Sequence, residues 1–219
     1  MYLNSKIKDI KALILWPLLG CEKEAFLASP EDVMAQFRSM TITSGTQLID
    51  FNRMHRSMLQ QLMRLYKDPT IDIRKSPDVT FLGEMAADLG GPTKEFFHVA
   101  IEALVKMDTL YRMQLFTGEQ GHYVPICNMD ALSSGCFEMV GKLLAHSFLH
   151  GGTGLVGLAP AVVKYLTCGS VVEAQDLVTI TDIPDLDIRS LLQTKVLQVH
   201  WYRMRMLRFL KLLGRLCIR

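Results

Sequence analysis

The sequence lacks clustered cysteines. Its five cysteines are scattered, at Cys21, Cys127, Cys136, Cys168 and Cys217, and no two of them form a C-x-x-C pair. Disulfide scaffolds and structural zinc sites both need cysteines at close, regular spacing. The pattern therefore argues against both, and it predicts free thiols in a reducing compartment, the cytoplasm or the nucleus.

Long hydrophobic runs are also missing. Near the N-terminus, three lysines precede the apolar stretch Ala12–Gly20, which Pro17 interrupts and which is too short to cross a bilayer. This profile is similar to that of a short signal peptide. The alternative, which we expect, is an apolar segment that docks on the folded body.

Acidic residues are absent after Asp187. Basic residues follow at Arg189, Lys195, Arg203, Arg205, Arg208, Lys211, Arg215 and Arg219, so with a net charge of +2 the rest of the chain carries +2 − 8 = −6. The basic surplus belongs to the C-terminal tail. For this reason the sequence does not predict nucleic-acid binding by the chain as a whole.

The tail itself, residues 201–219, has the pattern of a basic amphipathic helix. Its basic stripe lies largely opposite Met206, Leu210, Leu213 and Leu216. Such a segment is typical of contact with an anionic membrane surface or a calmodulin-like groove. The alternatives are a helix docked on the body, near the apolar residues 186–192, and an unselected tail from an alternative or truncated transcript.

The residues that are present predict an α+β fold, mainly helical, with a few short strands and hairpins. Val79, Phe81 and Gly83 alternate with their neighbours as in a strand, and residues 115–125 read as a hairpin whose loop is 118–121. The longest helix is expected over residues 46–66, with Leu48, Phe51, Met54 or His55, Met58, Leu62 and Leu65 on its buried side. Further helices are expected over residues 30–40 (N-cap Ser29), 92–105, 133–149, 160–168 (ended by Gly169) and 188–192. In the helix over 133–149, Phe137, Val140, Gly141, Leu144 and Phe148 are expected to face inward.

Two patterns suggest ligands, and each has a structural alternative. Gly90–Gly91 precedes a helix, yet the G-x-G-x-x-G and P-loop patterns are absent, so we expect a turn and no cofactor. His146 and His150 have metal-ligand spacing on one helix, but Ser147 replaces the glutamate of an H-E-x-x-H site. We expect packing or capping histidines and no metal.

One stretch resembles a known family. Phe-Leu-Gly-Glu at 81–84 and Asp-Leu-Gly-Gly-Pro-Thr-Lys-Glu-Phe-Phe at 88–97 are similar to the signature of the N-terminal lobe of HECT-type ubiquitin ligases. The matching motif residues are Phe81, Gly83, Glu84, Asp88, Gly90, Gly91, Glu95, Phe96 and Phe97. Residues 115–125, 137–149 and 158–169 agree with the family in order. The resemblance implies an N-terminal extension (1–44), a truncated HECT-like lobe (45–193) and a divergent tail (194–219).

The resemblance also implies a function. HECT ligases are ubiquitin-protein transferases that take ubiquitin from a conjugating enzyme onto a cysteine of a separate C-terminal lobe. Here the family pattern stops at about Gln193, before the subdomain that receives the conjugating enzyme, and neither Cys168 nor Cys217 has the family's context, so no catalytic residue is assigned. We therefore expect a truncated family member, with ubiquitin and a conjugating enzyme as the family's partners, that cannot form the thioester alone. The alternative is a non-catalytic binding or regulatory module for ubiquitin, a substrate or a full-length ligase.

Overall fold

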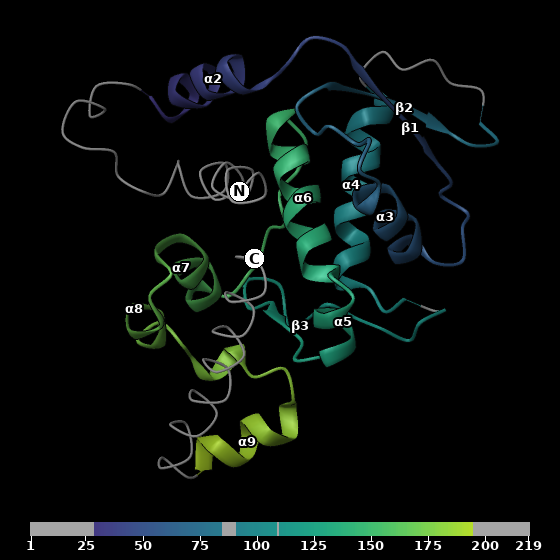
Figure 1. Ribbon diagram of the computed structural model, residues 1–219. Coiled ribbons are helices and arrows are strands. Elements are labelled where there is room, and N and C mark those ends of the chain that lie inside the picture. Colours follow the sequence, from purple (N-terminus) through teal and green to yellow (C-terminus); the bar gives the residue numbers. More distant parts are fainter. Residues whose placement is uncertain (1–28, 85–90, 109, 195–219) are drawn as a thin grey trace. The chain divides into compact units, whose positions relative to one another are not determined.

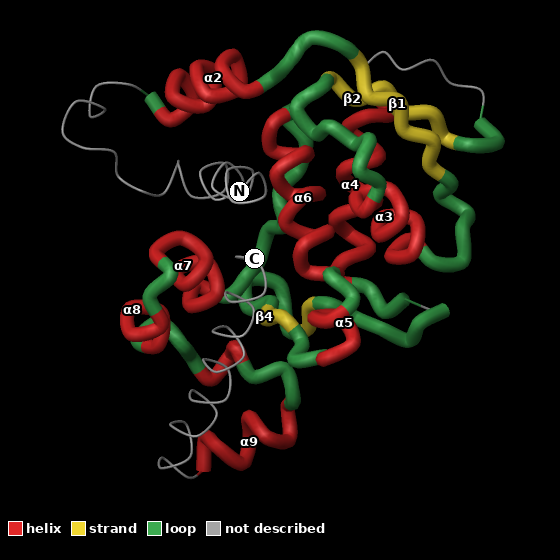
Figure 2. Tube along the Cα trace, in the orientation of Figure 1, coloured by secondary structure: helices red, strands yellow, loops and turns green. Residues whose placement is uncertain are grey.

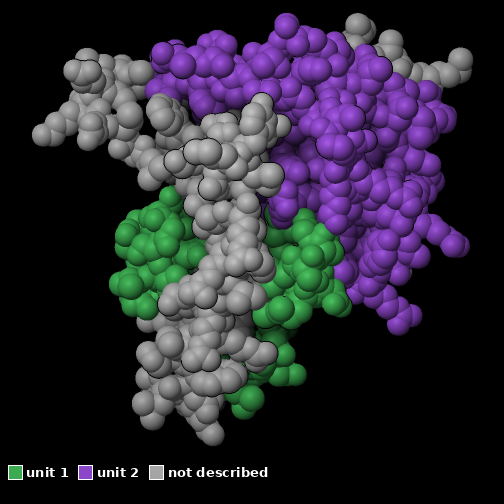
Figure 3. Space-filling model, viewed as in Figure 1, with its two compact units in different colours: residues 1–19, 115–137, 156–219 green, residues 20–114, 138–155 purple. Residues whose placement is uncertain are grey.

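The computed structural model describes residues 29–84, 91–108 and 110–194 (Figure 1). This part of the chain is mainly helical with a few short strands (Figure 2), so the predicted α+β class is confirmed. The chain divides into two compact units (Figure 3): unit 1 comprises residues 1–19, 115–137 and 156–219, and unit 2 comprises residues 20–114 and 138–155. The predicted N-terminal segment, the motif residues Asp88 and Gly90, and the tail after Thr194 lie outside the described residues.

Unit 2 is built from helices and one parallel strand pair. Its elements are α2 (Pro30–Thr41), β1 (Thr46–Phe51), α3 (Met58–Lys67), β2 (Ser76–Phe81), α4 (Gly91–Val105) and α6 (Cys136–Leu149, whose first two residues belong to unit 1). The two strands pair from Thr46 opposite Ser76 to Phe51 opposite Phe81, with α3 in the connection between them. This is a β-α-β arrangement, which parallel neighbours require because a tight turn cannot connect them.

The core of unit 2 is aromatic. Alternate residues of β1 and β2 are buried, as a strand with one covered face requires. Phe51 from β1 packs edge-on against Phe96 from α4, with ring centroids 5.0 Å apart, and lies 6.3 Å from the Phe81 ring of β2. The helix α3 adds Leu62 and Tyr66, which are 0% and 2% exposed.

The predicted helix over residues 46–66 is wrong in its first half. Residues 46–51 form β1, a loop follows, and the helix α3 begins only at Met58. Ile49 and Phe51 are each 1% exposed whereas Leu48 is 71% exposed, so the true period is two residues and Leu48 is not on a buried helical stripe. The loop is held locally, because Asn52 Oδ1 accepts the N–H of Met54 and Ser57 caps α3. The helix ends at Lys67, one residue beyond the predicted end, and Asp68 is its C-cap.

The other predicted helices of unit 2 are confirmed with smaller changes. Ser29 caps α2 in a capping box with Asp32, and Arg38 of α2 donates to the Phe148 carbonyl at 3.0 and 3.3 Å. The predicted helix over 133–149 begins only at Cys136: Ser133 is the last residue of a separate short helix, α5 (Met129–Ser133), and Gly135 (φ 77°) lies between the two helices. Met139, Leu143, His146 and Ser147 face inward in α6, whereas the predicted Gly141, Leu144 and Phe148 are only half-buried.

Unit 1 contains a short hairpin and small helices. Its elements are β3 (Phe116–Thr117), β4 (Val124–Pro125), α5 (Met129–Ser133), α7 (Pro160–Cys168), α8 (Val171–Gln175), the 3₁₀ turn η2 (Ile180–Asp182) and α9 (Leu186–Thr194). The predicted hairpin is confirmed, with Phe116 opposite Pro125 and Thr117 opposite Val124, but its loop runs from 118 to 123. Gly169 ends α7 with a φ of 68°, as predicted.

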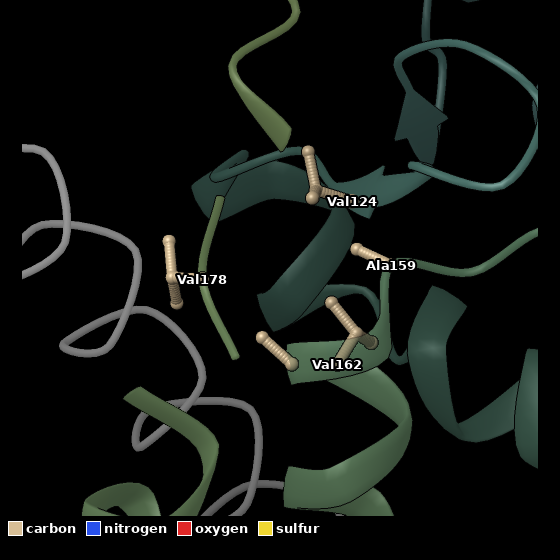
Figure 4. Close-up of a cluster of buried hydrophobic side chains, with 5 residues drawn as sticks. Val124, Ala159, Val162 and Val178 are labelled. Carbon is tan, nitrogen blue, oxygen red and sulfur yellow. The ribbon is translucent and has the colours of Figure 1, made fainter. Parts of the chain in front are cut away.

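The best-defined apolar cluster of unit 1 consists of small side chains. Val124, Ala159, Val162 and Val178 come together there, with Ala161 as a fifth member (Figure 4). Each of the five is at most 5% exposed. In the described ranges, no helix is both long and apolar enough to span a membrane.

Candidate functional site around the motif residues

Three of the motif residues surround one arginine in unit 2. Arg53 follows β1, and its guanidinium carbon lies 4.1 Å from the ring centroid of Phe81. The same guanidinium reaches Glu84, just past β2, and Glu95 on α4. Side chains from the ends of β1 and β2 and from α4 thus meet at one place. We call these four side chains the Arg53 cluster: Arg53, Phe81, Glu84 and Glu95.

Hydrogen bonds and charge hold the Arg53 cluster together. The guanidinium makes a two-point contact with the Glu84 carboxylate, in which Nε donates to Oε1 at 2.8 Å and Nη2 donates to Oε2. Nη1 donates to Glu95 Oε1 at 3.2 Å. The hydrogen bond to Glu84 raises the pKa of Arg53, and its counterpart lowers the pKa of Glu84, so both groups are ionised at neutral pH.

The remaining motif residues shape the backbone and the core. Gly83 has a φ of 88°, a conformation that costs glycine little and other residues more. Phe96 and Phe97 are both 0% exposed and lie 5.3 Å apart between ring centroids, so they pack the core and do not bind a ligand directly. Gly91 begins α4. Of the motif residues, therefore, the structure brings Phe81, Glu84 and Glu95 together around Arg53, with the two glutamates exposed and the Phe81 ring buried.

The two predicted packing histidines lie in the core of unit 2. His146 is 0% exposed, and its Nδ1 lies 3.0 Å from the hydroxyl of the buried Tyr66. Burial lowers the pKa of His146 to about 3 and raises the pKa of Tyr66. His150 Nε2 lies 2.9 Å from the Ile73 carbonyl, a contact in which the imidazole N–H donates. Both histidines therefore have structural roles, and the described residues contain no cluster able to hold a metal ion.

The described cysteines lack the surroundings of a nucleophile. Cys136 is buried, and Cys168 is half-buried with its Sγ donating to the Lys164 carbonyl at 2.9 Å. Cys127 is exposed. Within the described ranges no hydrogen bond joins any of these thiols to a histidine that could take its proton.

Sequence reasoning missed a polar pair in unit 1. Asp182 has a fully buried side chain, and its Oδ1 lies 2.7 Å from His122 Nδ1. Its other oxygen, Oδ2, accepts the N–H and the hydroxyl of Thr179 at 2.8 and 3.0 Å. The contact with the carboxylate calls for a proton on Nδ1, and in the neutral tautomer of His122 that has it, Nε2 is an acceptor. The partners are 60 residues apart in sequence, so no local pattern identified them.

This pair has the orientation of the acid and base in a catalytic triad, but among the described residues no nucleophile is hydrogen-bonded to the histidine. In the described part of the chain His122 makes hydrogen bonds through Nδ1 only, and none through Nε2 to a hydroxyl or thiol. Arg189 reinforces the same region by donating to the carbonyls of Thr181 and Ile183 and pairing with Glu119. The arrangement therefore ties the hairpin loop of unit 1 to η2 and α9.

Unit 2 also contains a polar cleft of about 410 Å³ at the starts of β1 and β2. Polar residues that line it are Thr46, Ser76, Asp78, Thr93, Lys94 and His150. The Asp78 carboxylate accompanies the Lys94 ammonium, so the cleft has no excess of positive charge for a phosphate. Thr93 donates its hydroxyl to the Pro77 carbonyl at 3.4 Å. These contacts favour a structural role for the region after Gly91.

No protein-family model, curated protein or solved structure matches the chain. The resemblance to HECT ligases therefore depends on the motif residues themselves and on the order of the elements that carry them.

Proposed function

We propose that this chain is the large part of the N-terminal lobe of a HECT-type ubiquitin-protein ligase, in a truncated form that does not carry the ubiquitin thioester itself. The observation that carries the proposal is the Arg53 cluster. Phe81, Glu84 and Glu95 belong to the family motif, and their side chains meet around one guanidinium. If the sequence matched the family motif by chance, there would be no reason for the side chains of these residues to meet in space.

The order of elements gives further support. A strand that ends at Phe81, a glycine in the left-handed region at Gly83 and a helix with two buried phenylalanines follow one another, as the family signature implies. The hairpin β3–β4 and the helices α6 and α7 then follow in the expected order. In this role the chain would supply the folded platform, while ubiquitin transfer would need the cysteine lobe of a complete ligase.

A second candidate is a non-catalytic module that binds ubiquitin, a substrate or a full-length ligase. The surroundings of the described cysteines favour this second candidate for the polypeptide taken by itself. An attacking thiol must be accessible and partly ionised. Cys136 is buried, the Cys168 thiol is engaged with a backbone carbonyl, and the exposed Cys127 has no basic partner among the described residues.

A chimera tests family membership. Residues 45–193 would replace the corresponding segment of an active HECT ligase, and transfer from a charged conjugating enzyme to the ligase's own cysteine would be read on a non-reducing gel. We expect a reducible ubiquitin adduct, lost when the acceptor cysteine is changed to alanine. A chimera that folds by circular dichroism but accepts no ubiquitin from any conjugating enzyme would contradict membership.

The unmodified chain tests the second half of the proposal. Incubated with activating enzyme, ubiquitin and a panel of conjugating enzymes, it should form no reducible adduct. An adduct that disappears in Cys168→Ala or Cys127→Ala would show that the chain is itself a ligase. Cys136→Ala serves as the matched control, because that thiol is buried.

A further inference from the structure

The strand β1 has one open edge. Ser76 N–H donates to the Gly45 carbonyl and Leu82 N–H donates to the Phe51 carbonyl, so the odd-numbered residues of β1 direct their backbone groups toward β2. Backbone groups in a strand alternate between its two edges. The N–H and C=O groups of Thr46, Leu48 and Asp50 therefore point away from β2, and we call this row the β1 edge.

Nothing in the described part of the chain pairs with the β1 edge as a strand. Within residues 29–84, 91–108 and 110–194, the sheet has the strand order β1–β2. Thr46, Leu48 and Asp50 are all exposed, Leu48 at 71%. Among the described residues, the one hydrogen bond to this row is long, from the Gln47 side-chain amide to the Leu48 carbonyl at 3.3 Å.

The open edge has a defined end. At Asn52, the next outward-facing position, the side chain of Gln61 takes both backbone groups, accepting the Asn52 N–H at 3.1 Å and donating to its carbonyl at 2.9 Å. The same two bonds at Thr46, Leu48 and Asp50 are left for water or for another backbone. Exposed edges of this kind are templates for an additional strand.

We propose that the β1 edge binds an extended peptide segment as a third strand of the sheet. The backbone row specifies the class of ligand, because only an extended chain presents donors and acceptors at the same repeat. The exposed side chains specify its composition. Leu48 calls for an apolar residue, and the Asp50 carboxylate calls for a basic residue two positions away on the same face.

Charge on the sheet supports a basic ligand. The two strands, Thr46–Phe51 and Ser76–Phe81, contain Asp50 and Asp78 on their exposed face and no lysine or arginine. Both carboxylates belong to positions that alternate with the buried residues. This inference stands on the geometry of the sheet, so it does not depend on the proposed ligase function.

The probe is a fluorescein-labelled peptide as long as β1, with one lysine and one valine two positions apart and threonine elsewhere. Two matched derivatives carry two N-methyl groups each, either on lysine and valine or on two threonines at the alternating positions. An added strand presents only one of these amide sets to β1. We expect one derivative to bind the full chain roughly tenfold or more weakly than the parent, and the other to bind like it, in fluorescence anisotropy.

Variants of the chain locate the binding site. Leu48→Pro removes an outward N–H that β2 does not use, whereas Leu48→Ala keeps it, so only the proline variant should abolish binding. Asp50→Lys should weaken binding of the lysine peptide. Protection of the Ile49 and Phe51 amides in hydrogen exchange checks that the β1–β2 ladder persists in each variant.

Three results would overturn the proposal. They are a peptide that does not bind at all, two N-methylated derivatives that bind equally, or a Leu48→Pro variant with an intact ladder that binds the peptide like the original chain. Self-association that rises with concentration and disappears in Leu48→Pro would assign the edge to a second copy of this chain, and so would also reject a peptide partner.

Discussion

The two units of the molecule are stabilised in different ways. In unit 2, large rings from β1, β2 and α4 pack on one another, and a histidine and a tyrosine are buried within the same core. In unit 1 the apolar cluster is made of valines and alanines, and polar ties through Asp182 and Arg189 hold its loops. A ring removes more apolar surface from water than a valine does, so each core side chain of unit 2 is expected to contribute more than a member of the valine cluster of unit 1, which also buries one ring pair, Phe116 and Phe137.

The largest effect is expected for Phe97→Ala. Phe97 is 0% exposed, and its ring lies 5.3 Å from Phe96 and 5.1 Å from His146. Truncation should lower the free energy of unfolding by about 3–5 kcal/mol in urea denaturation. Val162→Ala in unit 1 should cost only about 1–2 kcal/mol, and Met40→Ala, at a side chain that is 79% exposed, provides the neutral control. Equal losses for Phe97→Ala and Val162→Ala would remove the distinction between the two cores.

Acid should destabilise unit 2 through His146. Its pKa is lowered to about 3 by burial, whereas the unfolded chain has the ordinary value of 6.5, so the unfolded state takes up the proton first as the pH falls. Stability is then constant above about pH 6.5 and decreases below it, by about 2 kcal/mol between pH 7 and pH 5. His150, whose pKa is also lowered, acts in the same direction, while the lowered carboxylate pKa values of Asp72 and Glu84 matter only at lower pH.

The matched variant for this effect is His146→Phe. It should flatten the dependence of unfolding free energy on pH between 7 and 5, whatever its effect on stability at pH 7. An unchanged slope would mean that His146 is not the neutral, buried group that its contacts indicate. Besides burial, two neighbouring groups act on the pKa of His146: His150 lowers it and Asp72 raises it.

The smallest of the three effects is expected for Arg189→Ala. The side chain is 13% exposed and donates to the Ile183 carbonyl at 2.7 and 3.1 Å and to the Thr181 carbonyl at 3.1 Å. Its loss should cost about 1–2 kcal/mol and speed hydrogen exchange of the amides in residues 179–183. Arg189→Lys should restore little, because an ammonium cannot reproduce the fork of donors. If exchange at 179–183 does not change, the polar tie is not what holds this region.

Local signals in the sequence predicted much of the fold. Ser29, Pro160 and Gly169 mark helix ends by their own chemistry, and the period of Phe96, Phe97, Ala100 and Leu104 was enough to predict α4. The motif residues also led to the Arg53 cluster. Arg53 itself was not identified, because it meets its partners only through the pairing of β1 with β2.

The failures share one physical cause. Residues 46–51 contain Leu48, Ile49 and Phe51, a set that fits a helix or a strand equally well until a partner strand selects one face. That partner begins at Ser76, far along the chain. The pair of His122 and Asp182 depends on a contact across 60 residues of sequence. In both cases the deciding interaction is non-local, so a window of sequence does not contain it.

The interleaving of the two units has a practical consequence for the gene. Residues 115–137 of unit 1 interrupt unit 2, which resumes at 138–155. No single cut of the polypeptide can release either unit whole, and a ribosome must complete the inserted stretch before unit 2 has all its parts. Shortened versions of this protein that end anywhere between 115 and 155 should therefore emerge as substrates for the cell's proteases.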